Sequence, residues 1–314
     1  MTSLMKYELI EHATFKQGLN RLESTVKRGL SGEPLILPIF GPTRVGKSEL
    51  IKTVLADNPP TVIDGIRHIP ILRVVAPVNP TRRSLPIAVL EGLKSPRYNR
   101  SSSEELTRMA CELLKITRTK VLVLDEMQHF AERGSQTATR EAADWLKVLA
   151  EEMNLTLVLT GSPLANEVLL RNEQLRDRSE AVFDFRPYNW NHEGEQLEFR
   201  RALLSLTEAF TDAGWTAPDA SDLDYGRRVY GACLGRIGML MKLFRAAEHS
   251  AKGHLITEKT MARAYAEAVN TRFLEFNPFE GQPPVESLLG QGYARMLTEA
   301  RMPIPKAAQK RVQA

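Results

Sequence analysis

The chain has 314 residues, of which 43% are hydrophobic and 25% charged, values close to those of an ordinary folded protein. Forty-two lysines and arginines against 38 acids give a net charge of +4, which by itself indicates no particular partner. No apolar run approaches the ~18 to 20 residues that span a bilayer, and residues 1–20 lack the apolar core of a signal peptide, so we expect a cytoplasmic protein with no membrane contact.

Short apolar runs alternate with helical patterns in the first part of the chain. Residues 14–30 carry apolar side chains at a spacing of three and four, which predicts an amphipathic helix. The apolar runs after it are short and nearly continuous, as is typical of strands buried on both faces of a parallel sheet. This alternation predicts an α/β fold with helices on both sides of the sheet. The expected strands are 35–40, 69–76, 121–124, 155–160 and 181–185, and the expected helices include 47–55, 103–115 and 139–153.

The rest of the chain is expected to be helical. Helical periodicity dominates from Gly194 to about Asn270, and no apolar strand run is visible there, which predicts a small helical domain. Residues 303–314 include three bases and no acid, a pattern typical of a mobile basic tail. Cys111 and Cys233 have neither the spacing nor the histidine neighbours of a zinc site, so buried thiols are expected.

The most specific motif joins the first strand to the next helix. Residues 41–48 read GPTRVGKS, a full G-x4-G-K-S (Walker A) pattern that arises by chance in roughly one chain per hundred of this length. Glycines there let successive backbone N–H groups surround phosphate oxygens at the positive end of the helix dipole. Lys47 would reach the β- and γ-phosphates and the Ser48 hydroxyl would bind Mg²⁺, the alternative being a glycine-rich turn before an ordinary helix. The residues expected to contact the nucleotide here are Gly41, Pro42, Thr43, Arg44, Val45, Gly46, Lys47, Ser48 and Glu49.

A second motif (Walker B) supplies two carboxylates. Residues 121–126 read VLVLDE, which puts Asp125 and Glu126 at the carboxyl end of a buried strand, where α/β sheets bind ligands. Asp125 would hold Mg²⁺ through water and Glu126 would polarise the attacking water, the alternative being an acidic helix cap. Thr160 or Ser162, at the end of the next strand, would hydrogen-bond the γ-phosphate or the water, with helix capping as the alternative.

Several arginines are candidates for contact with phosphate. Arg171, Arg176 and Arg178 lie shortly before the last expected strand, where one of them would reach a neighbouring protomer's nucleotide as an arginine finger. The residues alone leave open which one. Arg236 precedes a helix of the helical domain, at a place where it would meet the γ-phosphate, and a solvated arginine is the alternative.

One stretch is more basic than the rest of the chain. Residues 77–100 hold five bases and a single acid, Glu91, which gives +4 within 24 residues. Such a concentration favours binding to nucleic-acid phosphates with release of counterions, although a solvated charged face is as common. The bases are Arg82, Arg83, Lys94, Arg97 and Arg100.

Together these motifs resemble those of the AAA+ ATPases and, within that class, those of the TnsC and TniB regulators of DNA transposition. The resemblance extends from about residue 12 to 280. One departure is that many AAA+ proteins end the fourth strand with asparagine, where this chain has Thr160 and Ser162. The residues that carry the resemblance are 41–48, Asp125-Glu126-Met127-Gln128-His129, Thr160-Gly161, 174–178 (QLRDR), 235–238 (GRIG) and 277–279 (NPF).

The resemblance implies a particular organisation and chemistry. It implies a helical lead-in (1–30), an AAA+ nucleotide-binding domain (31–190), a helical lid (191–270) and a partly mobile C-terminal extension (271–314). ATP and Mg²⁺ are the implied cofactors, and hydrolysis would depend on Glu126, Lys47 and Thr160 together with Arg178, which matches the family's arginine best. Arg236 would contact the nucleotide from the lid.

The resemblance also implies partners. Proteins of this kind use ATP to assemble into rings or filaments on duplex DNA, which the basic stretch 77–100 would contact through phosphates rather than bases. They link a TniQ-like target selector, sometimes with a CRISPR guide complex, to a transposase, and ATP hydrolysis releases the assembly. Two other functions stay open: an AAA+ clamp loader, replication initiator or other remodelling ATPase, and a scaffold that binds nucleotide without hydrolysing it.

Overall fold

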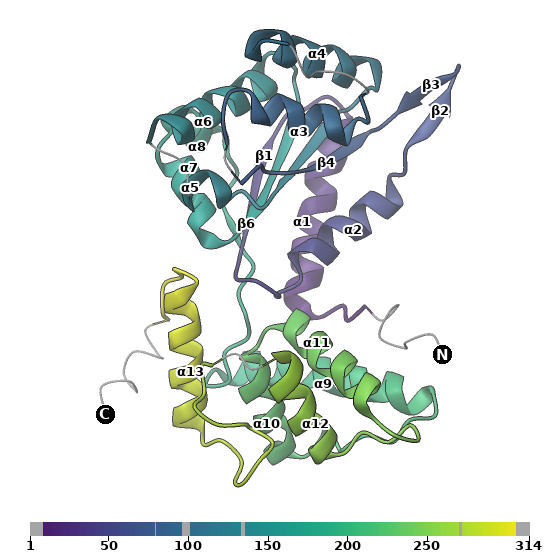
Figure 1. Ribbon diagram of the computed structural model, residues 1–314, viewed down its shortest axis with the longest axis vertical. Coiled ribbons are helices and arrows are strands. Elements are labelled where there is room, and N and C mark those ends of the chain that lie inside the picture. The colour runs from purple at the N-terminus through teal and green to yellow at the C-terminus, as the bar shows by residue number, and fades with distance from the viewer. Residues whose placement is uncertain (1–8, 79, 96–100, 133–135, 270–271, 306–314) are drawn as a thin grey trace. The chain divides into compact units, whose positions relative to one another are not determined.

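The computed structural model describes residues 9–78, 80–95, 101–132, 136–269 and 272–305, which form two compact units whose elements are labelled in Figure 1. An α/β unit contains Gln17–Gly41 and Lys47–Phe185. A helical unit contains Arg186–Ala314 together with Met1–Lys16 and Pro42–Gly46. The last passage from the α/β unit to the helical unit falls between Phe185 and Arg186, a few residues before the predicted boundary at residue 190. The expected lead-in 1–30 is divided between the two units. Most of the predicted basic tail lies outside the described residues.

The α/β unit is built on a parallel five-stranded sheet in the order β4-β5-β6-β1-β7. The carboxyl ends of parallel strands meet at one edge, so the segments that follow β1, β5 and β6 are brought together there. This arrangement confirms the predicted α/β fold class, with a parallel sheet in the first part of the chain. The strands of the sheet are β1 (Ile36–Phe40), β4 (Ile71–Val75), β5 (Val121–Asp125), β6 (Thr156–Gly161) and β7 (Phe183–Asp184).

Helices cover both faces of this sheet. Alternate strand residues such as Leu122 and Leu157 are fully buried in a core that the helices on one face complete. On the other face α1 approaches closely, because a Cβ added at Gly29 would lie 2.3 Å from the Thr156 hydroxyl of β6. The helices of this part of the chain are α1 (Ala13–Leu30), α2 (Lys47–Asp57), α3 (Ser84–Gly92), α4 (Ser103–Ile116), α5 (His129–Glu132), α6 (Gln136–Glu151), α7 (Asn166–Leu170) and α8 (Glu173–Arg178), with a 3₁₀ turn at Pro163–Ala165.

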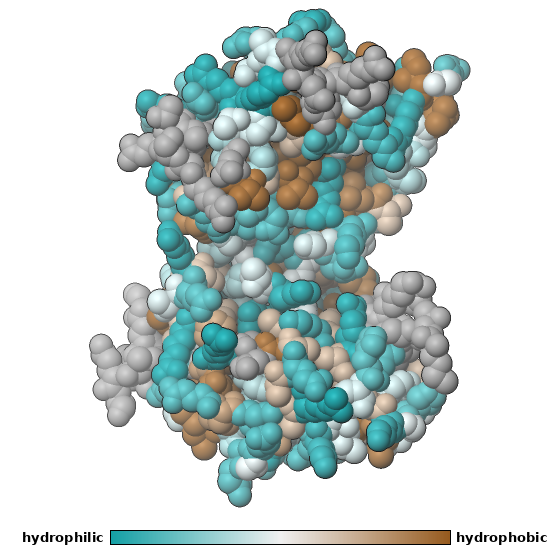
Figure 2. Space-filling model, in the orientation of Figure 1, coloured by the Kyte–Doolittle hydropathy of each residue, from teal (hydrophilic) through white to brown (hydrophobic). Residues whose placement is uncertain are grey.

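A β-hairpin after α2 was not predicted. Its strands, β2 (Thr61–Ile63) and β3 (Ile66–His68), pair antiparallel across a two-residue turn of Asp64 and Gly65, both of which have positive φ. Aspartate followed by glycine between apolar residues is a known hairpin signal, so the sequence did carry the information. Val62 is 71% exposed, and Figure 2 shows hydrophobic side chains in brown where Figure 1 places the hairpin.

The helical unit has its own core. It combines aliphatic and aromatic side chains, and the fully buried Tyr230 contacts the rings of Trp190 and Phe199. Among the described residues, every helix of the protein is too short or too polar to cross a membrane. The helices of this unit are α9 (Glu193–Asp212), α10 (Leu223–Cys233), α11 (Ile237–Ser250), α12 (Glu258–Ala264) and α13 (Glu286–Glu299), with a π-helical turn at Tyr265–Val269.

Candidate nucleotide site

The phosphate-loop segment lies between β1 and α2, as the sequence predicts. Gly41 follows β1 directly, and a Cβ added to it would lie 2.3 Å from the main-chain oxygen of Phe185, so only glycine fits there. Gly46 has φ of 123°, a conformation that favours glycine. Ser48 and Glu49 are exposed in the first turn of α2, where unpaired N–H groups attract anions.

Lys47 is the first residue of α2 and is directed back toward the end of β1. Its ammonium donates to the Gly41 carbonyl oxygen at 2.6 Å. Burial lowers the pKa of Lys47 to about 8, and the negative charges of Glu126 and Asp125 partly oppose that shift. The ammonium has lost much of its hydration, and the two nearby carboxylates help to keep it charged. Such a group binds an added anion strongly, because phosphate oxygens would replace the lost water contacts.

Asp125 is the last residue of β5, and its side chain is only 3% exposed. Its Oδ1 accepts hydrogen bonds from the Thr160 hydroxyl at 2.6 Å and from the Glu126 backbone N–H at 3.0 Å. Its Oδ2 forms an ion pair with Arg73 Nη2 at 2.6 Å. The carboxylate is therefore fixed from three sides, as a deeply buried charge requires.

Glu126 follows at a left-handed backbone position, with φ of 60°, which is unusual for a residue other than glycine. Its carboxylate accepts a hydrogen bond from the Gln128 side-chain amide. The Gln128 oxygen in turn accepts from the Ser162 backbone N–H at 2.9 Å. Gln128 thus connects the predicted water-polarising carboxylate to the end of β6, a role that sequence reasoning did not assign.

The structure therefore brings Lys47, Asp125, Glu126 and Thr160 together within the α/β unit. Thr160 was expected to contact the γ-phosphate or water, and here its hydroxyl is buried and donates to Asp125. Arg73, on β4, was missed altogether. The one signal for it is a single charged residue inside the apolar run 69–76.

The three candidate finger arginines are all exposed and ion-paired on the surface of the α/β unit. Arg171 pairs with Glu167 at 2.8 Å, Arg176 with neighbouring acids of α8, and Arg178 with Glu151 of α6 at 2.6 Å. Exposed pairs of this kind contribute about 0–1 kcal/mol, so any of the three guanidinium groups is available to a stronger anion. Arg178 remains our candidate for the finger.

Arg236 is buried, so it is not the solvated arginine that was the alternative interpretation. It caps α11, is 5% exposed, donates from Nε to the Cys233 carbonyl oxygen and lies over the Phe273 ring. Burial lowers the pKa of its guanidinium, which marks a strongly desolvated charge. Arg236 thus packs inside the helical unit, and its Nη2 is buried with no hydrogen-bond partner among the described residues. Its contact with the nucleotide stays a prediction.

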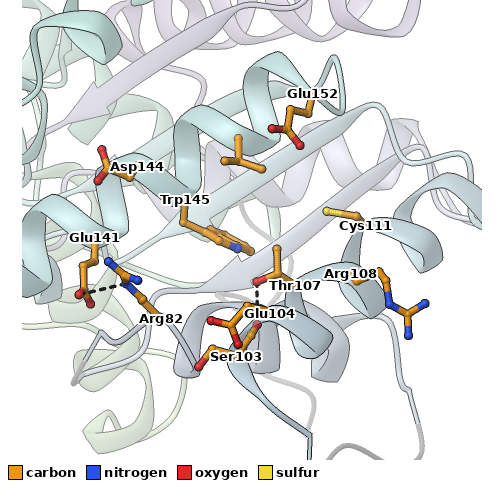
Figure 3. Close-up of a pocket in the computed structure, with 11 residues that line it drawn as sticks. Arg82, Ser103, Glu104, Thr107, Arg108, Cys111, Glu141, Asp144, Trp145 and Glu152 are labelled. Atoms are coloured by element: carbon orange, nitrogen blue, oxygen red, sulfur yellow. Dashed lines mark hydrogen bonds and ion pairs between the residues drawn. The ribbon is translucent and has the colours of Figure 1, made fainter.

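Within the basic stretch, Arg82 borders an open groove of about 530 Å³ between α4 and α6 (Figure 3). Its Nε pairs with Glu141 at 3.0 Å, drawn as a dashed line. The groove also exposes the carboxylates of Glu104, Asp144 and Glu152, for which the described residues provide no ion pair. The surroundings of Arg82 are thus more acidic than the local sequence indicates.

The other bases of this stretch have varied surroundings. Arg83 is partly buried and donates to the Ser101 carbonyl oxygen. Lys94 is exposed just after α3, at a left-handed position with φ of 60°. Arg97 and Arg100 lie outside the described residues. Among the described residues, no group of three or more His, Cys, Asp or Glu side chains is placed to hold a metal ion.

Several solved structures have the same fold. Cdc6p of Pyrobaculum aerophilum matches with a TM-score of 0.59 at 12% identity, covering 99% of this chain and 88% of that one. The ORC2 protein of Aeropyrum pernix in its ADP form gives 0.58 at 12% identity, over 99% and 87%. The ORC1 protein of the same organism, solved with DNA, gives 0.56 at 18% identity, over 84% and 68%. Similarity at these identities establishes the fold alone.

The fold is that of the AAA+ P-loop ATPases, with a parallel sheet between helices and a helical region after it. The family model for bacterial TniB protein matches residues 1–188, which is more than half of the chain. The chain belongs to the TniB family, a group of transposition-related AAA+ ATPases, and the resemblance noted in the sequence is confirmed. No curated protein gives a significant match.

Proposed function

We propose that the chain binds ATP with Mg²⁺ at the carboxyl edge of its sheet and hydrolyses it to ADP and phosphate. The observation that carries the proposal is the convergence of Lys47, at the start of α2, with Asp125 and Glu126, at the end of β5. The lowered pKa of Lys47, which responds to both carboxylates, supports the same grouping. Positioned charge of this kind is the main requirement for phosphoryl transfer.

Each residue has a role that its surroundings permit. Lys47 binds the β- and γ-phosphate oxygens, and the N–H groups at the start of α2 bind the rest of the triphosphate. Glu126 orients and polarises the attacking water, and Gln128 holds its carboxylate ready. Arg178 of a neighbouring protomer neutralises charge that develops during transfer.

The donor set fits Mg²⁺. Ser48 and Asp125 offer a hydroxyl and a carboxylate, and hard oxygen ligands together with phosphate oxygens are what Mg²⁺ prefers. When bound, the ion neutralises phosphate charge and orients the oxygens that react. Ser48 would hold it directly and Asp125 through water.

Hydrolysis is tested with two variants and a control. Glu126→Gln should retain ATP binding and lose at least about 100-fold in turnover, because only the general base is removed. Lys47→Ala should lose ATP binding itself. Glu112→Gln, which alters an exposed carboxylate of α4, should change neither quantity. Turnover is measured by phosphate release and binding by calorimetry. Full turnover in Glu126→Gln contradicts the assignment.

We further propose that the ATP-bound protein assembles into rings or filaments on duplex DNA. Membership of the TniB family and the concentration of bases at 77–100 support this. Phosphates would be contacted by Arg82, Arg83, Lys94, Arg97 and Arg100, with no dependence on base sequence. The weak surface pair between Arg82 and Glu141 could exchange for a phosphate contact.

In this account the assembly links a TniQ-like target selector, with or without a CRISPR guide complex, to a transposase, and hydrolysis dismantles it. Size-exclusion chromatography and electron microscopy with duplex DNA and a non-hydrolysable ATP analogue test the assembly. Monomers under those conditions contradict it. A stable assembly with no phosphate release would instead indicate a nucleotide-stabilised scaffold, and capture of replication proteins would indicate a loader or initiator.

A further inference from the structure

Asp125, the proposed magnesium carboxylate, forms an ion pair with Arg73, a residue that has no role in the chemistry described above. Arg73 is on β4, the edge strand of the sheet, and the register places Val75 opposite Asp125. Side chains two residues apart on a strand share a face, so Arg73 and Asp125 lie on the same side of neighbouring strands. Arg73 Nη2 contacts Asp125 Oδ2 at 2.6 Å.

The Arg73–Asp125 pair is much more deeply buried than an ordinary surface ion pair. The Asp125 side chain is 3% exposed and that of Arg73 32% exposed. Arg73 Nε is also buried, and no hydrogen-bond partner for it exists among the described residues. The guanidinium therefore satisfies Asp125 while remaining incompletely satisfied itself. A buried pair of this quality contributes little net stability, which leaves its position to be explained by function.

The two oxygens of Asp125 are held in different ways. Oδ1 accepts two hydrogen bonds, from Thr160 and from the Glu126 backbone, and both donors belong to fixed elements of the sheet edge. Among the described residues, the one donor to Oδ2 is Arg73, whose long side chain retains access to solvent. Loss of the Arg73 contact would thus free one oxygen and leave the carboxylate oriented by the other.

We propose that Arg73 is an internal counter-ion of Asp125, which neutralises this carboxylate before Mg²⁺ arrives and is displaced from Oδ2 when the hydrated ion binds. Arg73 is then a positioning residue that acts through Asp125. The inference rests on the proposed function, because it takes Asp125 as the magnesium carboxylate.

Two consequences of opposite sign follow. With no metal, Arg73 reduces the repulsion between Asp125 and the triphosphate, so it assists binding of metal-free ATP. With ATP in place, Arg73 competes with Mg²⁺ for the same oxygen, so it weakens Mg²⁺ binding. A purely structural pair would change both affinities in the same direction, through loss of a folded site.

The test compares Arg73→Gln with wild type, and with Arg67→Gln as a control that removes an equal charge from an exposed position on β3. Calorimetry measures the affinity for a non-hydrolysable ATP analogue in EDTA, and then the affinity of the analogue-saturated protein for Mg²⁺. In Arg73→Gln we expect Mg²⁺ to bind about tenfold more tightly and the metal-free analogue several-fold more weakly. Arg67→Gln should match wild type in both.

Arg73→Lys keeps the charge but loses the reach of the guanidinium, and it serves as a second variant if Arg73→Gln does not fold. The Mg²⁺ affinity of Arg73→Lys should lie between those of wild type and Arg73→Gln. If Arg73→Gln does not fold, Arg73→Lys should still bind Mg²⁺ more tightly than wild type. An Mg²⁺ affinity equal to or below wild type in a folded, analogue-binding Arg73 variant overturns the inference. Failure of the wild-type protein to bind the analogue would overturn the proposed function instead.

Discussion

Lys47→Met removes the ammonium beside the phosphate loop while keeping much of its length, and the effect on stability should depend on pH. Burial lowers the pKa of Lys47 from 10.5 to about 8 in the folded protein. Below pH 8 the lysine is charged in both the folded and the unfolded chain, so the folded state bears the full cost of the buried charge. Between about pH 8 and 10.5 the unfolded chain binds the extra proton, so the free energy of unfolding rises with pH.

The magnitude follows from the same shift. Each pH unit within the window is worth about 1.4 kcal/mol, so the stretch from pH 8 to 9.5 corresponds to about 2 kcal/mol. The side chain is only partly buried, and solvent screening reduces the expected gain to about 1 kcal/mol. The wild-type protein should therefore gain about 1 kcal/mol relative to Lys47→Met between pH 7 and pH 9.5.

Urea denaturation of both proteins at the two pH values measures this difference, since groups that titrate alike in both cancel. A pH-independent difference, or a loss of wild-type stability relative to Lys47→Met as the pH rises, would refute the burial of Lys47. Binding of ATP should show the opposite trend, because the phosphates need the protonated ammonium. Affinity should fall as the pH rises above about 8.

Three further substitutions probe other parts of the account. Gly41→Ala should destabilise the protein by about 2–4 kcal/mol and abolish ATP binding, since its Cβ would lie 2.3 Å from a main-chain oxygen; thermal denaturation and calorimetry measure both. Thr160→Val should cost about 1–3 kcal/mol, because a buried Asp125 oxygen loses a donor; an unchanged denaturation midpoint would contradict this. Reversing Arg82 and Arg83 to Glu should weaken DNA binding and flatten its salt dependence, and an equal slope in a salt titration would remove them from the interface.

The fold could be predicted from the sequence where burial is continuous. The apolar runs that became β1, β5 and β6 are buried along their whole length, and the edge strand β4 along most of it, so their composition reports the sheet directly. The hairpin β2–β3 was not predicted, because all of its strand residues except His68 are exposed and its one sequence signal is the turn Asp64-Gly65. Burial pattern carries no information about such a projecting element.

The site could be predicted where its residues belong to local motifs. Lys47 and Asp125 each stand at a fixed place between strand and helix, so spacing alone located them. Arg73 meets Asp125 across 52 positions of sequence, through the register of two strands, and no local pattern reports that register. The packing of Arg236 on Phe273 could not be predicted either, because a position before a helix does not report the direction of the side chain.

The most direct test of the central claim is a structure determined with Mg²⁺ and a non-hydrolysable ATP analogue. We expect the triphosphate at the start of α2, with Lys47 on its outer phosphates and the metal between Ser48 and Asp125. An analogue bound elsewhere, or a loop left empty at a concentration that saturates binding in solution, would contradict the account.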